Sequence, residues 1–201
     1  MKRIILSIAL IIGLGIAKIS AQTVTGGIKV EANTSNFILS DLDNVESKLG
    51  IGVTVGGIGI VEFSDNLAFR SEVLLHLKNS TIENKGGGEM DFQYFGVEIP
   101  LYAVGQFGMG NGKAFVGVGP YVGVGIDARY KSSGDKDIVL YDNSVFQRWD
   151  VGAGLLLGYE LSNKLQINAG YKIGFIDALD TGKDNATMLN QTISVGLAFS
   201  F

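Results

Sequence analysis

Apolar and polar side chains alternate along most of the chain after residue 24, with a period of two residues. The pattern is clearest near the C-terminus, where one face of a single segment is apolar. That face carries Trp149, Val151, Ala153, Leu155, Leu157, Tyr159 and Leu161. Because successive side chains of a β-strand point to opposite sides, this period predicts strands whose two faces meet different surroundings.

Eight segments follow the same rule, separated by stretches rich in Asp, Asn, Ser and Gly. The predicted strands are residues 24–33, 49–63, 67–78, 95–107, 114–130, 148–161, 165–175 and 192–201. Within residues 49–63 the apolar parity flips across Gly56 and Gly57. We expect a β-bulge there, because glycine accommodates an inserted residue.

The predicted connections between these strands alternate in length. Tight turns are expected at residues 64–66, 108–113 and 162–164, the second with the hairpin pair Asn111-Gly112. The longer loops are expected at residues 34–48, 79–89, 131–145 and 177–188. Short turns at one end and long loops at the other are typical of outer-membrane barrels, whose turns lie in the periplasm.

The N-terminus has the pattern of a secretory signal peptide. Lys2 and Arg3 precede an apolar run from Ile4 to Ala17, and Ala21 provides a small residue before a cleavage site. The run is shorter than the roughly 20 residues that a spanning helix needs. We therefore predict a signal peptide over residues 1–21 and one barrel domain over residues 22–201.

Composition narrows the function classes. The chain has 201 residues, 29 glycines and 2 prolines, which suits closely packed strands joined by turns. A net charge of −4 and a pI near 5.0 give no basic surface for nucleic acid. The absence of cysteine excludes disulfides and thiolate metal sites, and one histidine cannot form a histidine-rich metal centre. The acidic residues of the loops lack EF-hand spacing, so we expect neither a metal nor a cofactor.

The charges indicate which face of the strands is inside. A soluble lipocalin-like barrel or a β-sandwich would bury the apolar face. Here the polar face combines many glycines with six cations and six acids, a balance that a narrow lumen needs because an unpaired charge there is costly. The predicted lumen charge network contains Lys29, Glu31, Arg70, Glu72, His76, Lys78, Glu98, Asp127, Arg129, Arg148, Asp150, Glu160 and Lys172.

These observations predict an all-β fold, an eight-stranded antiparallel up-and-down transmembrane β-barrel with a polar, plugged lumen. The location is the outer membrane, and the barrel is expected to be monomeric and surrounded by outer-membrane lipid. The last strand ends in Phe199 and Phe201, which resemble the terminal aromatic signal that barrel-assembly machinery recognises during biogenesis.

Several tracts resemble the PorT-like outer-membrane β-barrel family. They are residues 95–101, residues 113–123, the run from Trp149 through Gly158 to Phe175, and the ending from Thr192 to Phe201. The resemblance covers nearly all of the chain after the signal peptide. It implies a membrane barrel, and the family's eponymous member takes part in protein secretion across the outer membrane.

Three functions remain open at this point. The first hypothesis is a structural or interaction barrel of the cell envelope, a possible secretion accessory whose long loops contact envelope proteins. The alternative is a narrow pore or a transporter of hydrophobic solutes, which would need a gap in the lumen network. The third is a membrane enzyme with His76 as general base, but histidine in a paired polar lumen is more often a hydrogen-bonding member, so we expect no enzyme activity.

Overall fold

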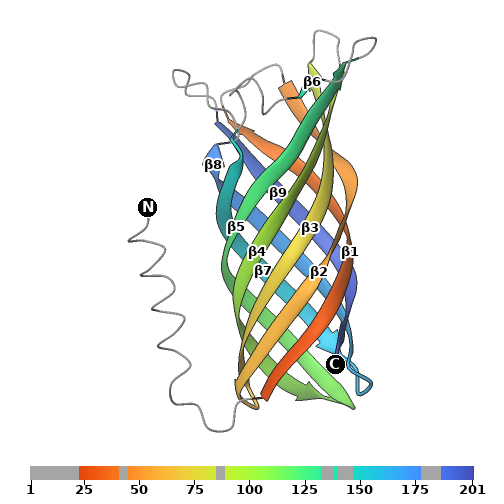
Figure 1. Ribbon diagram of the computed structural model, residues 1–201, viewed down its shortest axis with the longest axis vertical. Coiled ribbons are helices and arrows are strands. Elements are labelled where there is room, and N and C mark those ends of the chain that lie inside the picture. Colours follow the sequence, from red (N-terminus) through yellow and green to blue (C-terminus); the bar gives the residue numbers. More distant parts are fainter. Residues whose placement is uncertain (1–22, 41–44, 85–88, 133–137, 140–146, 178–186) are drawn as a thin grey trace.

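The chain folds as a closed antiparallel β-barrel of eight strands, as predicted (Figure 1). The computed structural model describes residues 23–40, 45–84, 89–132, 138–139, 147–177 and 187–201. The predicted signal peptide, residues 1–21, lies outside these ranges. Neighbouring strands pair in the order β4, β3, β2, β1, β9, β8, β7 and β5, and pairing of β4 with β5 closes the barrel.

The bounds of the strands follow the order of the chain. The eight barrel strands are β1 (Thr23–Ser40), β2 (Val45–Ser64), β3 (Leu67–Asn84), β4 (Glu89–Met109), β5 (Gly112–Ser132), β7 (Trp149–Glu160), β8 (Leu165–Asp177) and β9 (Thr187–Ser200). The two-residue β6 (Ile138–Val139) pairs with β5 at Tyr130 and Arg129, beyond the part of β5 that pairs with β7. In the described part of the chain no helix is long and apolar enough to cross a membrane.

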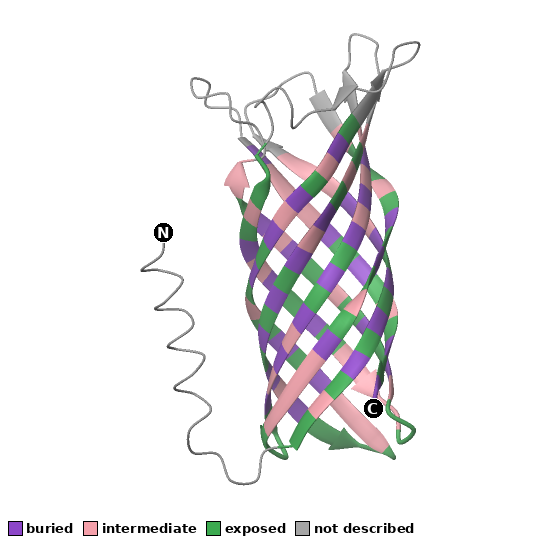
Figure 2. Cartoon of the chain, in the orientation of Figure 1, coloured by how far each residue is buried: buried purple, intermediate pink, exposed green. Residues whose placement is uncertain are grey.

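The two faces of each strand meet different surroundings, and the apolar face is outside. On β3, Arg70 and Glu72 are 2% and 1% exposed, whereas Val73 and Leu75 are 55% and 44% exposed. Figure 2 shows buried and exposed residues alternating along the strands. The inward face is therefore the one that carries the charges, which confirms the predicted orientation and excludes the lipocalin-like arrangement.

The barrel wall is taller on one side than the other. Strands β1 to β5 have 18 to 21 residues, whereas β7, β8 and β9 have 12 to 14. A tilted strand needs about 9–11 residues to cross the hydrocarbon. The prediction of loops over residues 34–48 and 79–89 was wrong, because most of these residues extend the strands. Backbone pairing continues through these extensions.

The predicted bulge at Gly56 and Gly57 was also wrong. Pairing of β2 with β3 runs without a shift through both glycines, and the shifts lie between Leu49 and Val53 and at the turn end of β2. The parity flips because Ile58 and Ile60 face the lumen, where Ile58 is buried and Ile60 packs against an apolar cluster.

The tight turn between β4 and β5 is displaced by one residue from the prediction. Met109 pairs with Gly112, so the loop consists of Gly110 and Asn111. Gly110 takes a positive φ of 60°, a conformation that glycine adopts without steric cost.

Candidate functional site

Seven buried charges form the centre of the lumen, which we call the central network: Lys29, Glu31, Arg70, Glu72, Lys78, Glu98 and Lys172. In its first part the Lys29 ammonium lies 2.9 Å from the Glu31 carboxylate and 3.1 Å from the Glu72 carboxylate. The Arg70 Nε atom donates to the same Glu72 carboxylate at 2.6 Å. Two cations and two acids thus neutralise one another across β1 and β3.

The second part of the central network is centred on Glu98 of β4. Its carboxylate accepts from the Lys78 ammonium at 3.2 Å and, through its other oxygen, from the Lys172 ammonium. Glu98 is 1% exposed. Strands that are far apart in sequence therefore meet at one carboxylate, which ties β3, β4 and β8 together across the lumen.

An amide joins the central network to the turn end of the lumen. The Gln166 side chain accepts from Arg70 at 2.7 Å and donates to Ser200 at 3.0 Å and to Glu160 at 2.7 Å. Glu160 is thus bound in the lumen, as predicted by its parity, but its partner is an amide. The sequence placed Gln166 on the polar face, but the predicted network did not include it. That prediction was built from charged residues and left out neutral amides.

His76 is buried beside the second part of the network. Its ring stacks on Tyr94 with 5.2 Å between centroids, and neither ring nitrogen has a hydrogen-bond partner among the described residues. A serine hydroxyl or a carboxylate bound to the imidazole would be needed for nucleophilic catalysis. The described surroundings of His76 thus give no positive evidence of catalysis.

Two predicted members, Asp127 and Arg129, do not face the lumen, and a third, Arg148, precedes β7. A register shift at Ile126 reverses the parity of β5, so Ala128 faces the lumen while Asp127 and Arg129 form an exposed ion pair of 2.8 Å. Arg148 is exposed just before β7. The assignment of Asp127 and Arg129 to the lumen was wrong, because alternation does not continue through an inserted residue. Arg148 lies before the strand whose alternation was used to place it inside.

Asp150 faces the lumen as predicted, nearer the loop end. Its carboxylate accepts from the Tyr121 hydroxyl at 3.0 Å and from the Asn190 amide at 2.9 Å.

A further ion pair, Lys113 and Glu62 at 3.0 Å, lies at the turn end and was not predicted from the sequence. The predicted bulge at Gly56 and Gly57 reversed the assumed parity and so kept Glu62 out of the predicted network. Alternation continued without a break from Gly52 would have placed Glu62 in the lumen.

The lumen is not polar throughout, contrary to the prediction. An apolar cluster of Ile60, Ala68, Tyr102, Val104, Phe115 and Leu156 packs on the turn side of the central network. The Phe115 ring centre lies 5.6 Å from the Arg70 guanidinium carbon. The filled part of the lumen therefore has an ionic layer and, on its turn side, an apolar layer.

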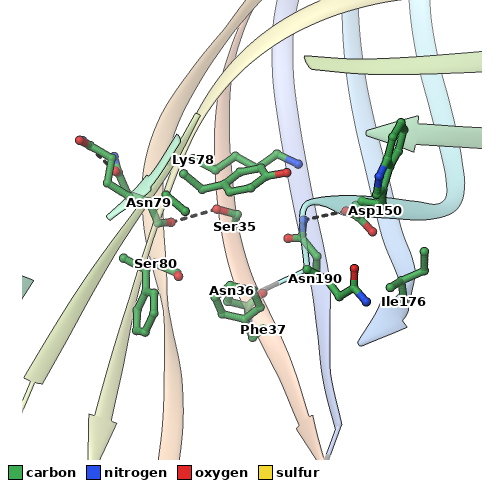
Figure 3. A pocket seen from close by; sticks show the side chains of 15 residues that line it. Ser35, Asn36, Phe37, Lys78, Asn79, Ser80, Asp150, Ile176 and Asn190 are labelled. Carbon is green, nitrogen blue, oxygen red and sulfur yellow. Dashed lines mark hydrogen bonds between the residues drawn. The ribbon is translucent and has the colours of Figure 1, made fainter. Parts of the chain in front are cut away.

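A small pocket lies at the loop end of the lumen (Figure 3). It encloses about 50 Å³, and its apolar walls are Phe37, Phe92, Tyr94, Trp149 and Ile176. In Figure 3 Asn190 and Asp150 are joined by a hydrogen bond on one side, and the Ser35 hydroxyl donates to the Asn79 carbonyl at 2.9 Å on the other. Apolar walls with a polar rim are suited to binding rather than to bond-breaking chemistry.

A larger cavity of about 230 Å³ lies at the turn end. It is lined by Arg70 and the apolar cluster on its inner side and by Glu62, Lys113, Glu160 and Lys164 nearer the mouth. It shares no lining residue with the loop-end pocket. Between them on β3 stand Glu72, Leu74 and His76, each at most 3% exposed.

Comparisons with known proteins agree with this architecture. The family described as outer membrane protein beta-barrel domain matches residues 20–180. The neisserial surface protein A structure superposes with a TM-score of 0.51 at 16% identity, covering 90% of this chain and 100% of that one. Its resemblance supports the fold alone.

Two further structures are similar at lower scores. Ail of Yersinia pestis, solved with a heparin analogue, has a TM-score of 0.47 and 16% identity and covers 89% of this chain and 99% of that one. OprG of Pseudomonas aeruginosa has a TM-score of 0.45 and 12% identity and covers 90% and 95%. Among curated proteins none matches this chain.

Proposed function

Since the chain belongs to the outer membrane protein beta-barrel domain family, we propose that it is a non-conducting interaction barrel of the outer membrane, whose loop end binds another envelope protein. The PorT-like resemblance of residues 95–101 and 113–123 favours an accessory role in secretion. Phe199 and Phe201, both exposed at the outer surface of β9, would be recognised by the assembly machinery.

The filled lumen carries the non-conducting part of the proposal. Glu98, Tyr102 and Leu156 come from two strands that do not pair, and each is at most 2% exposed. Ions would have to pass both the apolar cluster and the central network. Opening such a path would separate buried ion pairs, a change that costs several kcal/mol per charge left alone.

The loop end carries the interaction part. Strands β1 to β5 exceed the length needed to cross the hydrocarbon, so their upper parts stand clear of it. The loop-end pocket opens at this end and has room for one small apolar group between Phe37, Phe92 and Trp149. An apolar side chain of a protein partner fits this chemistry, with the polar side chains of Gln147 and Asn190 at the rim.

Planar-bilayer recording tests the non-conducting part. The folded barrel, verified by a heat-dependent shift in electrophoretic mobility, should give no steady channels, while a porin in the same bilayer should conduct. A double variant, Tyr102→Ala with Leu156→Ala, removes two large plug side chains and should raise the frequency of openings. Steady conductance of the wild type would refute the proposal.

Site-specific photo-crosslinking in whole cells tests the interaction part. A photoreactive residue at Gln147, exposed at the rim of the loop-end pocket, should capture one discrete protein. The matched control is Gly108, exposed at the turn end with open space around it. Capture from Gly108 alone would place the partner at the wrong end of the barrel.

A narrow pore or solute transporter is the second candidate. The observation in its favour is that the lumen is hollow at both ends, with only its central part filled. Uptake of small solutes into liposomes that contain the barrel distinguishes the two functions. An interaction barrel leaves the uptake rate at the level of empty liposomes.

A further inference from the structure

The turn-end cavity is large enough for a small organic molecule. Its volume of about 230 Å³ exceeds the roughly 150 Å³ of an engineered protein cavity that binds benzene. At about 30 Å³ for each water-sized group, it has room for roughly eight non-hydrogen atoms. In outer-membrane barrels this end faces the periplasm, so the molecule would enter from there.

One side of the cavity is apolar. Ile60, Ala68, Val104 and Phe115 line it, and all four belong to the apolar cluster. Apolar surface transferred from water to such a wall contributes about 25 cal/mol per Å². A ring or a short alkyl chain is therefore the part of a ligand that this side favours.

Cations exceed acids among the charged residues that line the cavity. Arg70, Lys113 and Lys164 stand against Glu62 and Glu160. Lys113 pairs with Glu62 at 3.0 Å, and Glu160 accepts from Gln166. Arg70 is itself paired with Glu72, which lies behind the lining, so the cavity carries no excess charge. Its preference for a carboxylate therefore rests on hydrogen-bond donors that face the cavity.

Arg70 adds a specific donor at the inner end. Its Nε and Nη1 atoms donate to Glu72 and Gln166, but its buried Nη2 atom has no acceptor among the described residues. A buried donor without an acceptor is destabilising, so an acceptor brought to it is favoured. Because Nη2 is shielded, a ligand reaches it only when a neighbouring side chain moves. The Phe115 ring, which lies beside the Arg70 guanidinium, is the side chain that would have to move.

We propose that the turn-end cavity binds a small organic monocarboxylate, with its apolar part against Val104 and Phe115 and its carboxylate toward Arg70 and Lys113. This site is separate from the loop-end surface of the proposed function, and either can fail without the other. The two sources of such a group are a free short-chain acid and the C-terminus of a peptide.

Isothermal titration of the folded full-length barrel in detergent micelles tests the proposal, with hexanoate as the probe and empty micelles as the blank. Hexanamide has the same size and no charge. Loss of a charge-assisted hydrogen bond, about 1.5–3 kcal/mol, predicts that hexanamide binds roughly tenfold to a hundredfold more weakly. Equal binding of the two would overturn the proposal, because it would reflect apolar partition only. A peptide ending in a free carboxylate, compared with its amide, tells the second source from the first.

Two variants locate the binding. Ala68→Leu fills the cavity and should abolish hexanoate binding, whereas Ala103→Leu, the same change on the lipid-facing side of β4, should not. Lys113→Gln at the partly exposed mouth keeps the fold and should weaken binding severalfold. Heat-dependent mobility verifies that each variant is folded. Binding of hexanoate to folded Ala68→Leu with wild-type affinity would place the site elsewhere and refute the proposal.

Discussion

Glu98 is the residue whose replacement tests the central network most directly. In Glu98→Gln an amide of the same shape replaces the carboxylate that lies between Lys78 and Lys172. Both ammonium groups are then left buried without their counter-charge. Removing one partner of a buried pair costs about 3–5 kcal/mol, and about 4 kcal/mol lowers the folding constant roughly a thousandfold.

Unfolding by urea, an uncharged denaturant, in detergent micelles measures this loss. Trp149 is the only tryptophan and lines the loop-end pocket, so its fluorescence reports the loss of its folded surroundings on unfolding. Asp127→Asn is the matched control, because it breaks an exposed ion pair of 2.8 Å whose loss costs about 0–1 kcal/mol. High salt should weaken the exposed pair and leave the buried one almost unchanged.

A second change separates charge from packing. Adding Lys172→Met to Glu98→Gln removes one of the two stranded ammonium groups and should restore at least half of the lost free energy of unfolding. If Glu98→Gln and Asp127→Asn shift the unfolding midpoint equally, the central network does not stabilise the barrel and the reasoning from buried charge is wrong.

Three further changes test the plug, the register and the assembly signal. Leu156→Ala should lower the free energy of unfolding by about 2–5 kcal/mol because it leaves a cavity in the apolar cluster, while Leu155→Ala on the lipid side should cost much less in the same denaturant titration. The chain has no cysteine, so a single introduced cysteine reports the accessibility of its own position. Arg129→Cys should react with a membrane-impermeant maleimide on cells, whereas Ala128→Cys should not. The reverse result would contradict the bulge in β5. Phe201→Ser should reduce the amount of folded barrel in the outer membrane, measured by heat-dependent mobility, with little change in unfolding midpoint.

The sequence alone determined the strands and the side that faces lipid. Alternation is a local property of two successive residues, so it can be read without knowing which strands pair. The balance of charges on one face then placed that face inside: Lys29, Arg70 and Glu98 each follow the parity of their own strand, and all three are buried in the lumen.

Only the tertiary structure decided where the register shifts and what meets in the lumen. The inserted residue at Ile126 became visible through pairing of β5 with β4, and it moved Asp127 and Arg129 to the outside. Continuous pairing of β2 with β3 likewise showed that Ile58 faces inward. Which strands lie opposite each other depends on closure of the whole barrel, and no local pattern contains that information.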